Sequence, residues 1–160
     1  MNVRPVVLSL LAVTSVAAAD QPTLKQLEKY LAGSDPVMVA NAMAECAGVY
    51  EALSAAAKKI GRPAESEDLK NRHNGAMMAA EYLLAVNYQF KTGKKRKLGA
   101  FDPYVQGIIG TSSTHYLALL EASDQQELNA EATKCKAVQP TINYVVEQLR
   151  SQLLVPQTTH

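Results

Sequence analysis

The chain has 160 residues, of which 19% are charged, and its formal net charge is +1. This balance excludes a globally basic nucleic-acid-binding protein, and no segment after the N-terminus approaches the 18 consecutive apolar residues of a membrane-spanning helix. Abundant alanine, the absence of tryptophan, and few glycines or prolines away from segment boundaries favour one all-α domain.

The N-terminal residues 1–19 have the three parts of a secretory signal peptide. Arg4 and the amino terminus supply positive charge, an apolar stretch follows, and three alanines precede Asp20. This order predicts cleavage after Ala19 and export of a mature domain, residues 20–160, with a buried N-terminal helix as the alternative. The mature chain has no Asn-x-Ser/Thr site, which favours the bacterial periplasm as its location.

Five amphipathic segments follow, with apolar residues recurring at alternating steps of three and four. Thr23 and Gln26 form a capping box at the start of the first segment. Asp35 and Pro36 begin the second as N-cap and first helical residue, and the fourth begins with the same Asp-Pro pair. The expected helices cover residues 23–32, 36–60, 64–91, 102–122 and 124–154.

Four long helices with short connections predict an up-and-down four-helix bundle, with the short N-terminal helix packed across one end. The stretch "GIIGTSST" (107–114) is poor helix material, and its small residues most simply allow two helices to pack tightly. Close approach of a ligand is the alternative. Pro140 lies inside the last helix and predicts a kink or a short break near Val138, and the unbroken periodicity favours the kink.

The two cysteines, Cys46 and Cys135, both lie on the apolar seams of their helices. Two thiols in an oxidising compartment pair by default, and these two have only one intramolecular choice. We therefore expect a structural disulfide that staples the second helix to the last. A redox-active pair is disfavoured because there is no Cys-x-x-Cys motif and no basic residue beside Cys46.

Four side chains are candidates for a polar pocket inside the bundle: His73, Met77, Asn87 and His115. His73 and Asn87 fall at seam positions where apolar residues are expected. Imidazole and thioether groups could bind copper, or could ligate haem, but methionine is also an ordinary core residue. The simpler interpretation is a hydrogen-bonded pair, or a helix rotated by one position, so we expect no metal and no cofactor.

The connector "KTGKKRK" (91–97) holds five basic residues in an otherwise balanced chain. Such a patch could contact phosphate-rich lipid headgroups or an acidic protein, and a solvated loop without a partner is the alternative. Without interleaved aromatic residues it does not predict a nucleic-acid platform. The candidate contact residues are Lys91, Lys94, Lys95, Arg96, Lys97, Tyr88 and Tyr104.

The sequence lacks a Gly-x-Ser-x-Gly elbow, a phosphate-binding loop and a His-Glu-x-x-His motif, and no catalytic residue is assigned. We therefore expect a non-enzymatic periplasmic protein that binds another protein, such as an envelope component or a toxin that it neutralises. Nucleic acid is not an expected partner, and the mature chain is not expected to span a membrane. The alternative is a metal or small-ligand carrier that uses the polar pocket.

Overall fold

The computed structural model describes residues 33–154. They form helices α2 (Pro36–Lys59), α3 (Pro63–Thr92), α4 (Asp102–Ala122) and α5 (Gln125–Leu154), with a 3₁₀ turn, η1 (Leu98–Ala100), before α4. This part of the chain has no strand, which confirms the all-α prediction, and the helix ends lie within one residue of the expected ends. The predicted signal peptide (1–19) and N-terminal helix (23–32) lie outside the described residues.

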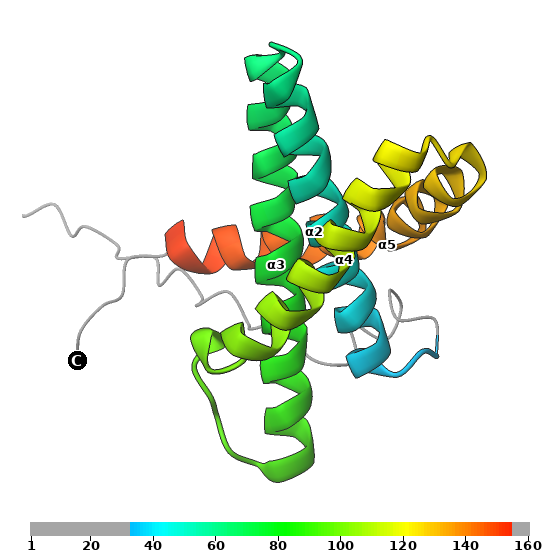
Figure 1. Ribbon diagram of the computed structural model, residues 1–160. Helices are drawn as coiled ribbons and strands as arrows, with labels where there is room; N and C mark the ends of the chain where they lie inside the picture. Colours follow the sequence, from blue (N-terminus) through cyan, green and yellow to red (C-terminus); the bar gives the residue numbers. More distant parts are fainter. Residues whose placement is uncertain (1–32, 155–160) are drawn as a thin grey trace, which may run out of the picture.

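The four helices form a bundle centred on α2, which contacts each of the other three. Helices α2 and α3 form an antiparallel hairpin, and α4 crosses this hairpin obliquely on the face shown in Figure 1. Helix α5 passes across the opposite face. The predicted four-helix bundle is therefore confirmed, with two of its helices crossing the hairpin rather than lying along its whole length.

Local sequence signals set the helix ends. The Asp35 carboxylate accepts a hydrogen bond from the backbone N–H of Val37 at 2.7 Å and caps α2. Gly93 ends α3 in the left-handed conformation (φ +68°), and its N–H donates to the Gln89 carbonyl at 2.8 Å. Helix α5 continues through Pro140 without interruption, which excludes a break and leaves the kink as the expected effect of the proline.

The core is built around small residues of α2 and α3. Buried alanines of α2 and α3 belong to one core cluster, together with larger side chains from α2, α3, α4 and α5. The largest fully buried side chains are Met43, Leu83, Val105, Ile109, Val145 and Cys46.

Helix α4 approaches α2 closely at Gly48. A Cβ atom at this position would lie 2.6 Å from the carbonyl oxygen of Ile109, and 2.8 Å from both the Ser112 Cβ and the Ser113 backbone nitrogen. Real Cβ atoms do not occupy such space, so the crossing requires glycine here. Gly48 therefore determines how deeply α4 sits on the hairpin.

One carboxyl group is buried in α3. Glu81 is 8% exposed, and its burial raises the pKa of the carboxyl, to which the negative charge of Asp102 adds. A raised folded-state pKa means that the folded protein binds this proton more readily than the unfolded chain. The contribution of Glu81 to stability is therefore most favourable at low pH, and it is lost as pH rises from the unfolded-state pKa through the folded-state pKa.

The substitution Glu81→Gln should raise the free energy of unfolding at pH 7 by about 0.5–1 kcal/mol, because it removes a charge that burial disfavours. The gain should vanish on acidification below the unfolded-state pKa. Urea denaturation at both pH values measures it. Glu67→Gln, an exposed residue of the same helix, is the control and should leave the pH dependence unchanged. A loss of stability at pH 7 would contradict this account.

Candidate functional site

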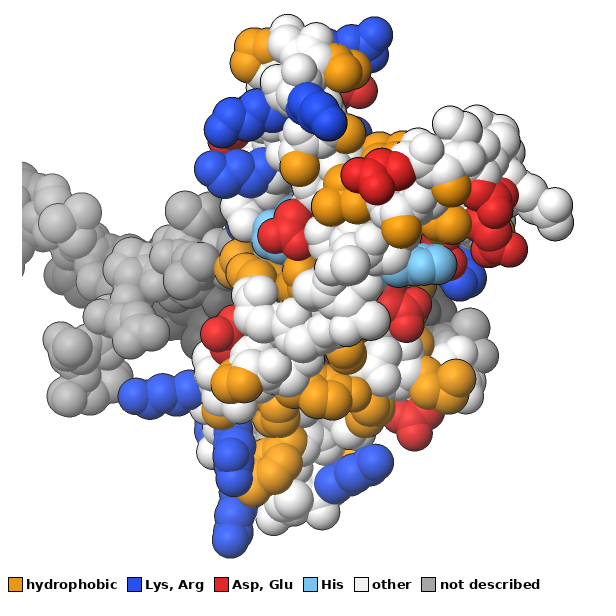
Figure 2. Space-filling model, viewed as in Figure 1, with side chains coloured by type: hydrophobic (Ala, Val, Ile, Leu, Met, Phe, Trp, Pro, Cys, Tyr) orange, Lys and Arg blue, Asp and Glu red, His pale blue; other side chains and the backbone are white. Residues whose placement is uncertain are grey.

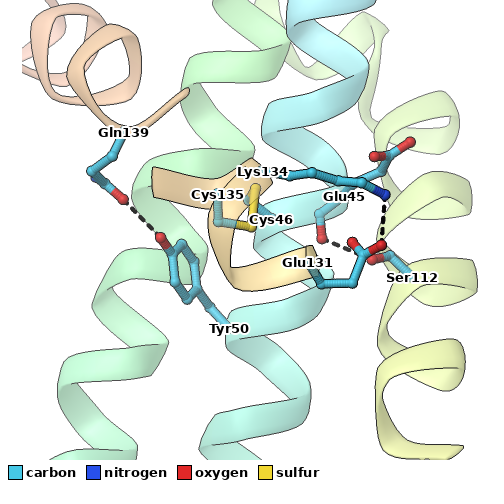
Figure 3. Close-up of a disulfide and its surroundings, with 8 residues drawn as sticks. All are labelled: Glu45, Cys46, Tyr50, Ser112, Glu131, Lys134, Cys135 and Gln139. Carbon is cyan, nitrogen blue, oxygen red and sulfur yellow. Dashed lines mark hydrogen bonds and ion pairs between the residues drawn. A yellow bond between two sulfur atoms is a disulfide. The ribbon is translucent and has the colours of Figure 1, made fainter. Parts of the chain in front are cut away.

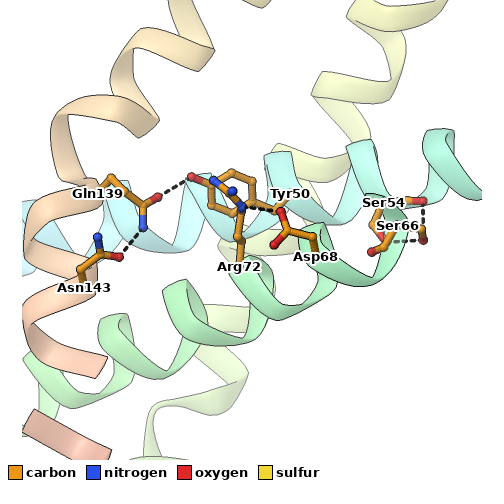
Figure 4. Close-up of polar contacts among 7 residues, drawn as sticks. All are labelled: Tyr50, Ser54, Ser66, Asp68, Arg72, Gln139 and Asn143. Carbon is orange, nitrogen blue, oxygen red and sulfur yellow. Dashed lines mark hydrogen bonds and ion pairs between the residues drawn. The ribbon is translucent and has the colours of Figure 1, made fainter. Parts of the chain in front are cut away.

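A disulfide joins α2 to α5 and organises the surface beside it (Figure 3). Cys46 and Cys135 are bonded with their Cα atoms 5.4 Å apart, and both residues are buried, which confirms the predicted pairing. One turn further along both helices, the Tyr50 hydroxyl donates to the Gln139 Oε1 at 2.7 Å (Figure 4). Both links join positions 89 apart in sequence, so α2 and α5 run in the same direction where they touch.

A cleft of about 480 Å³ lies between α2, α4 and α5, next to the disulfide. Glu45 and Lys134, the residues that immediately precede the two cysteines, stand on two of its walls. The bond between the cysteines therefore also holds these two charged side chains in place. The cleft is lined by Glu45, Tyr104, Gly107, Ile108, Thr111, Ser112, His115, Glu131 and Lys134.

The charge in the cleft is predominantly negative. The Glu131 side chain is only 13% exposed and accepts a hydrogen bond from the Lys134 Nζ at 2.6 Å. This bond raises the pKa of the lysine, and the negative charges of Glu131, Glu45 and Glu127 add to the effect. Three carboxylates act on one lysine, so the cleft favours a cationic group from outside over an anionic one.

The hydroxyl groups of the cleft are engaged in structural bonds. Ser112 donates to the Glu45 carbonyl at 2.8 Å, which ties α4 to α2 (Figure 3). The Tyr104 hydroxyl donates to the Asn41 Oδ1 at 2.9 Å. The serine hydroxyl thus points to a main-chain oxygen and not to the imidazole that a nucleophilic serine needs.

Two hydroxyl groups on the exposed side of α4 are bonded to the helix itself. The Thr111 and Thr114 hydroxyls donate back to the Gly107 and Gly110 carbonyls, at 3.0 and 2.8 Å, so the proton of each hydroxyl is already engaged. A Cβ atom on either glycine would meet nothing within 4 Å in the part of the chain that the structure describes. The tight helix packing predicted for 107–114 is therefore confirmed for the stretch but not for its glycines, because Ser112 and Ser113 make the close contact with Gly48 on the opposite side of α4.

This side of α4 also lacks charge. The eighteen residues from Pro103 to Leu120 include no Asp, Glu, Lys or Arg, although 19% of the whole chain is charged. Figure 2 shows the corresponding band as mostly white and orange, with acidic and basic side chains around it. We define the α4 outer face as the exposed residues Tyr104, Gly107, Gly110, Thr111, Thr114 and Leu117.

The four candidates for a shared polar pocket lie apart. His115 lines the cleft, whereas His73 lines a second hollow of about 320 Å³ between α2 and α3. His73 Nδ1 is 3.0 Å from the Ala47 carbonyl, a contact that fixes the ring against α2. Met77 is partly buried and accepts from the Gln106 side chain at 3.2 Å, and Asn87 is buried in α3.

The basic connector lies beside an aromatic cluster. The Arg96 guanidinium stands 4.8 Å from the centroid of the Tyr88 ring, and this ring packs edge-on against Phe101 at 6.2 Å. A hydrogen bond from Arg96 lowers the pKa of the Tyr88 phenol. Tyr104, which the sequence grouped with this segment, instead lines the cleft.

No protein-family model, curated protein or solved structure matches this chain. Among the described residues, no three His, Cys, Asp or Glu side chains are placed to hold a metal ion together. None of the described helices is both long and apolar enough to cross a membrane. The interpretation of the site therefore depends on its own geometry and charge.

Sequence reasoning missed the acidic wall of the cleft. Glu45 and Lys134 directly precede the two cysteines, and Glu131 lies one helical turn before Cys135. Once the disulfide was inferred, these neighbours could have been expected to lie together. Their contact with α4 could not, because it depends on the crossing at Gly48.

Proposed function

We propose that the protein is an exported, non-enzymatic helical bundle that binds another protein through the α4 outer face and the adjoining cleft. An envelope component, or a toxin that the protein neutralises, is the kind of partner that this function implies. The disulfide supports export, because disulfides persist in oxidising compartments. The engagement of Ser112 with a main-chain carbonyl supports a role without nucleophilic catalysis.

The α4 outer face is the observation that carries this proposal. A helix that packs on one side usually presents charged residues to solvent on the other, and α4 presents none over five turns. Protein interfaces are depleted of charge at their centres and enriched in tyrosine, and Tyr104 is 48% exposed on this face. Gly107 and Gly110, which meet no other part of the described residues 33–154, allow a partner backbone to come close.

The cleft indicates the chemistry of the partner. Glu131 and Glu45 stand beside the uncharged face, and Glu131 is largely shielded from water. A lysine or arginine from the partner would fit between these carboxylates while an uncharged surface covers α4. The partner is therefore expected to combine a small-residue or apolar helix face with one basic side chain.

Gly110→Arg should weaken partner binding at least tenfold, because it places a long charged side chain in the centre of the uncharged face. The fold should persist, since nothing lies within 4 Å of the new Cβ. Photo-crosslinking from position 114 in the producing cells identifies the partner. Titration with that partner then measures its affinity for the wild-type protein and for Gly110→Arg.

Asn71→Arg, an exposed position on α3, is the matched control and should leave the affinity unchanged. Crosslinking from position 114 that survives Gly110→Arg at full strength would contradict the proposed interface. If no protein is crosslinked and native mass spectrometry finds a small organic cation bound, the cleft is a small-ligand site, and the carrier alternative is favoured. The volume of the cleft suits such a ligand.

A further inference from the structure

A concentrated positive charge occupies the far end of α3. Between Glu81 and Asp102 the chain has five basic residues and no acidic one, and all five lie within 91–97. Figures 1 and 2 show this end of the molecule protruding, with basic side chains around apolar ones. We name as the basic tip the residues Phe90, Lys91, Lys94, Lys95 and Lys97.

Phe90 stands in solvent in the middle of this charge. It is 73% exposed, the largest exposed fraction among the large hydrophobic side chains of the described residues. Moving an aromatic ring from water into an apolar phase is favourable. An exposed ring beside Lys91 therefore combines an apolar group for insertion with a cation for anchoring.

The tip has a defined shape. Thr92 Oγ1 donates to the Tyr88 carbonyl at 2.8 Å and accepts from the Lys94 N–H at 3.2 Å, which folds the chain back after α3. Arg96 lies over the Tyr88 ring and is used within the protein. The four lysines remain exposed and available to an external partner.

We propose that the basic tip binds the surface of an anionic phospholipid bilayer, with the lysines against lipid phosphates and Phe90 inserted among the headgroups. This interaction goes beyond the proposed protein binding and uses none of the residues of the α4 outer face.

The chemistry of the tip favours a bilayer over an acidic protein. The residues of the tip that carry charge are all lysines, which are flexible point charges, while the planar guanidinium of Arg96, the group suited to recognise a carboxylate, lies over the Tyr88 ring. The tip is convex, and neither of the two hollows described above includes any of its residues. A protruding aromatic ring fits a deformable lipid surface better than a rigid one.

The opposite end of the hairpin is an internal control. Ile60 is 65% exposed there and follows Lys58 and Lys59, so it resembles the basic tip in composition. This end differs from the basic tip because it also has acidic residues, and one of them, Glu65, pairs with Arg62 at 3.3 Å. If charge and an exposed apolar residue must act together, this end should not bind lipid.

The chain has no tryptophan, so a single introduced tryptophan reports its own surroundings. Phe90→Trp and, separately, Ile60→Trp are mixed with phosphatidylglycerol vesicles and with phosphatidylcholine vesicles. The Trp emission of Phe90→Trp should shift to shorter wavelength with phosphatidylglycerol but not with phosphatidylcholine. The shift should disappear at high salt, and Ile60→Trp should show no shift with either lipid. Vesicle flotation of the wild-type protein should show the same lipid preference.

Three further sets of variants test the contributions of charge and of the aromatic ring separately. Replacing lysines of the tip by glutamine should weaken flotation on the order of fivefold per lysine. Phe90→Ala should weaken it by roughly tenfold or more, while Lys58→Gln with Lys59→Gln should have no effect. Equal binding by the wild-type and the four-lysine variant would overturn the proposal. So would a wild-type protein that ignores phosphatidylglycerol but is retained by immobilised polyglutamate, which would indicate an acidic protein partner.

Discussion

Removing the disulfide by the paired substitution of Cys46→Ala and Cys135→Ala should lower the free energy of unfolding by about 4–5 kcal/mol. The bond closes a loop between residues 89 apart, and without it the unfolded chain regains the conformations that this loop forbids. A domain of this size has only about 5–15 kcal/mol of stability in total. The cysteine-free protein should therefore be at the edge of folding at physiological temperature.

Urea denaturation of the oxidised protein, the reduced protein and the paired alanine variant measures this loss. Reduction should destabilise the wild-type protein and leave the alanine variant unchanged, which separates the bond from any effect of the reductant. Reduction should also loosen the cleft, since Glu45 and Lys134 adjoin the two cysteines. A wild-type protein whose unfolding midpoint is the same with and without reductant would contradict the prediction.

The helices could be predicted from the sequence because their signals are local. Asp35 before Pro36 and Gly93 after Thr92 act within one turn of the helix end, so the residues that decide each boundary are neighbours in the chain. The disulfide could also be predicted, since Cys46 and Cys135 have no other partner. These inferences needed no knowledge of how the helices cross.

The surface of α4 could not be predicted, because it depends on contacts between residues that are far apart in the chain. Gly48, Gly107 and Gly110 are all glycines within helices, and sequence does not show which of them meets another backbone. The spacing singles out the pair in α4, whereas the structure makes the close contact at Gly48 in α2. The stretch "GIIGTSST" therefore has two sides: Ser112 and Ser113 pack against Gly48 of α2, whereas the glycines and threonines lie on the exposed side that flanks the cleft.

His73 and His115 illustrate the same limit. Both were candidates for one pocket because each lies near the apolar pattern of its helix. Their helices face different neighbours, and His73 turns its Nδ1 to the Ala47 carbonyl while His115 lines the cleft. Periodicity shows which side of a helix a residue occupies, but the crossing of the helices decides which residues of two different helices meet.

Gly48→Ala should lower the free energy of unfolding by about 1–3 kcal/mol, although glycine to alanine inside a helix ordinarily raises it by about 1 kcal/mol. The added methyl group would meet the Ile109 carbonyl oxygen at 2.6 Å and main-chain atoms near Ser113 at 2.8 Å. A backbone cannot swing aside as a flexible side chain can, so α4 must move away from α2. That movement would also strain the bond from Ser112 to the Glu45 carbonyl.

The matched control is Gly110→Ala, which makes the same chemical change in a neighbouring helix. Its Cβ meets nothing within 4 Å, so it should raise the free energy of unfolding by about 1 kcal/mol. The two substitutions are therefore expected to have opposite signs in urea denaturation, and faster hydrogen exchange in α4 should accompany Gly48→Ala alone. Equal stabilisation by both would contradict the close crossing at Gly48. The opposite signs would also show that Gly110 reduces the stability of the isolated protein, a cost that a partner bound to the α4 outer face would explain.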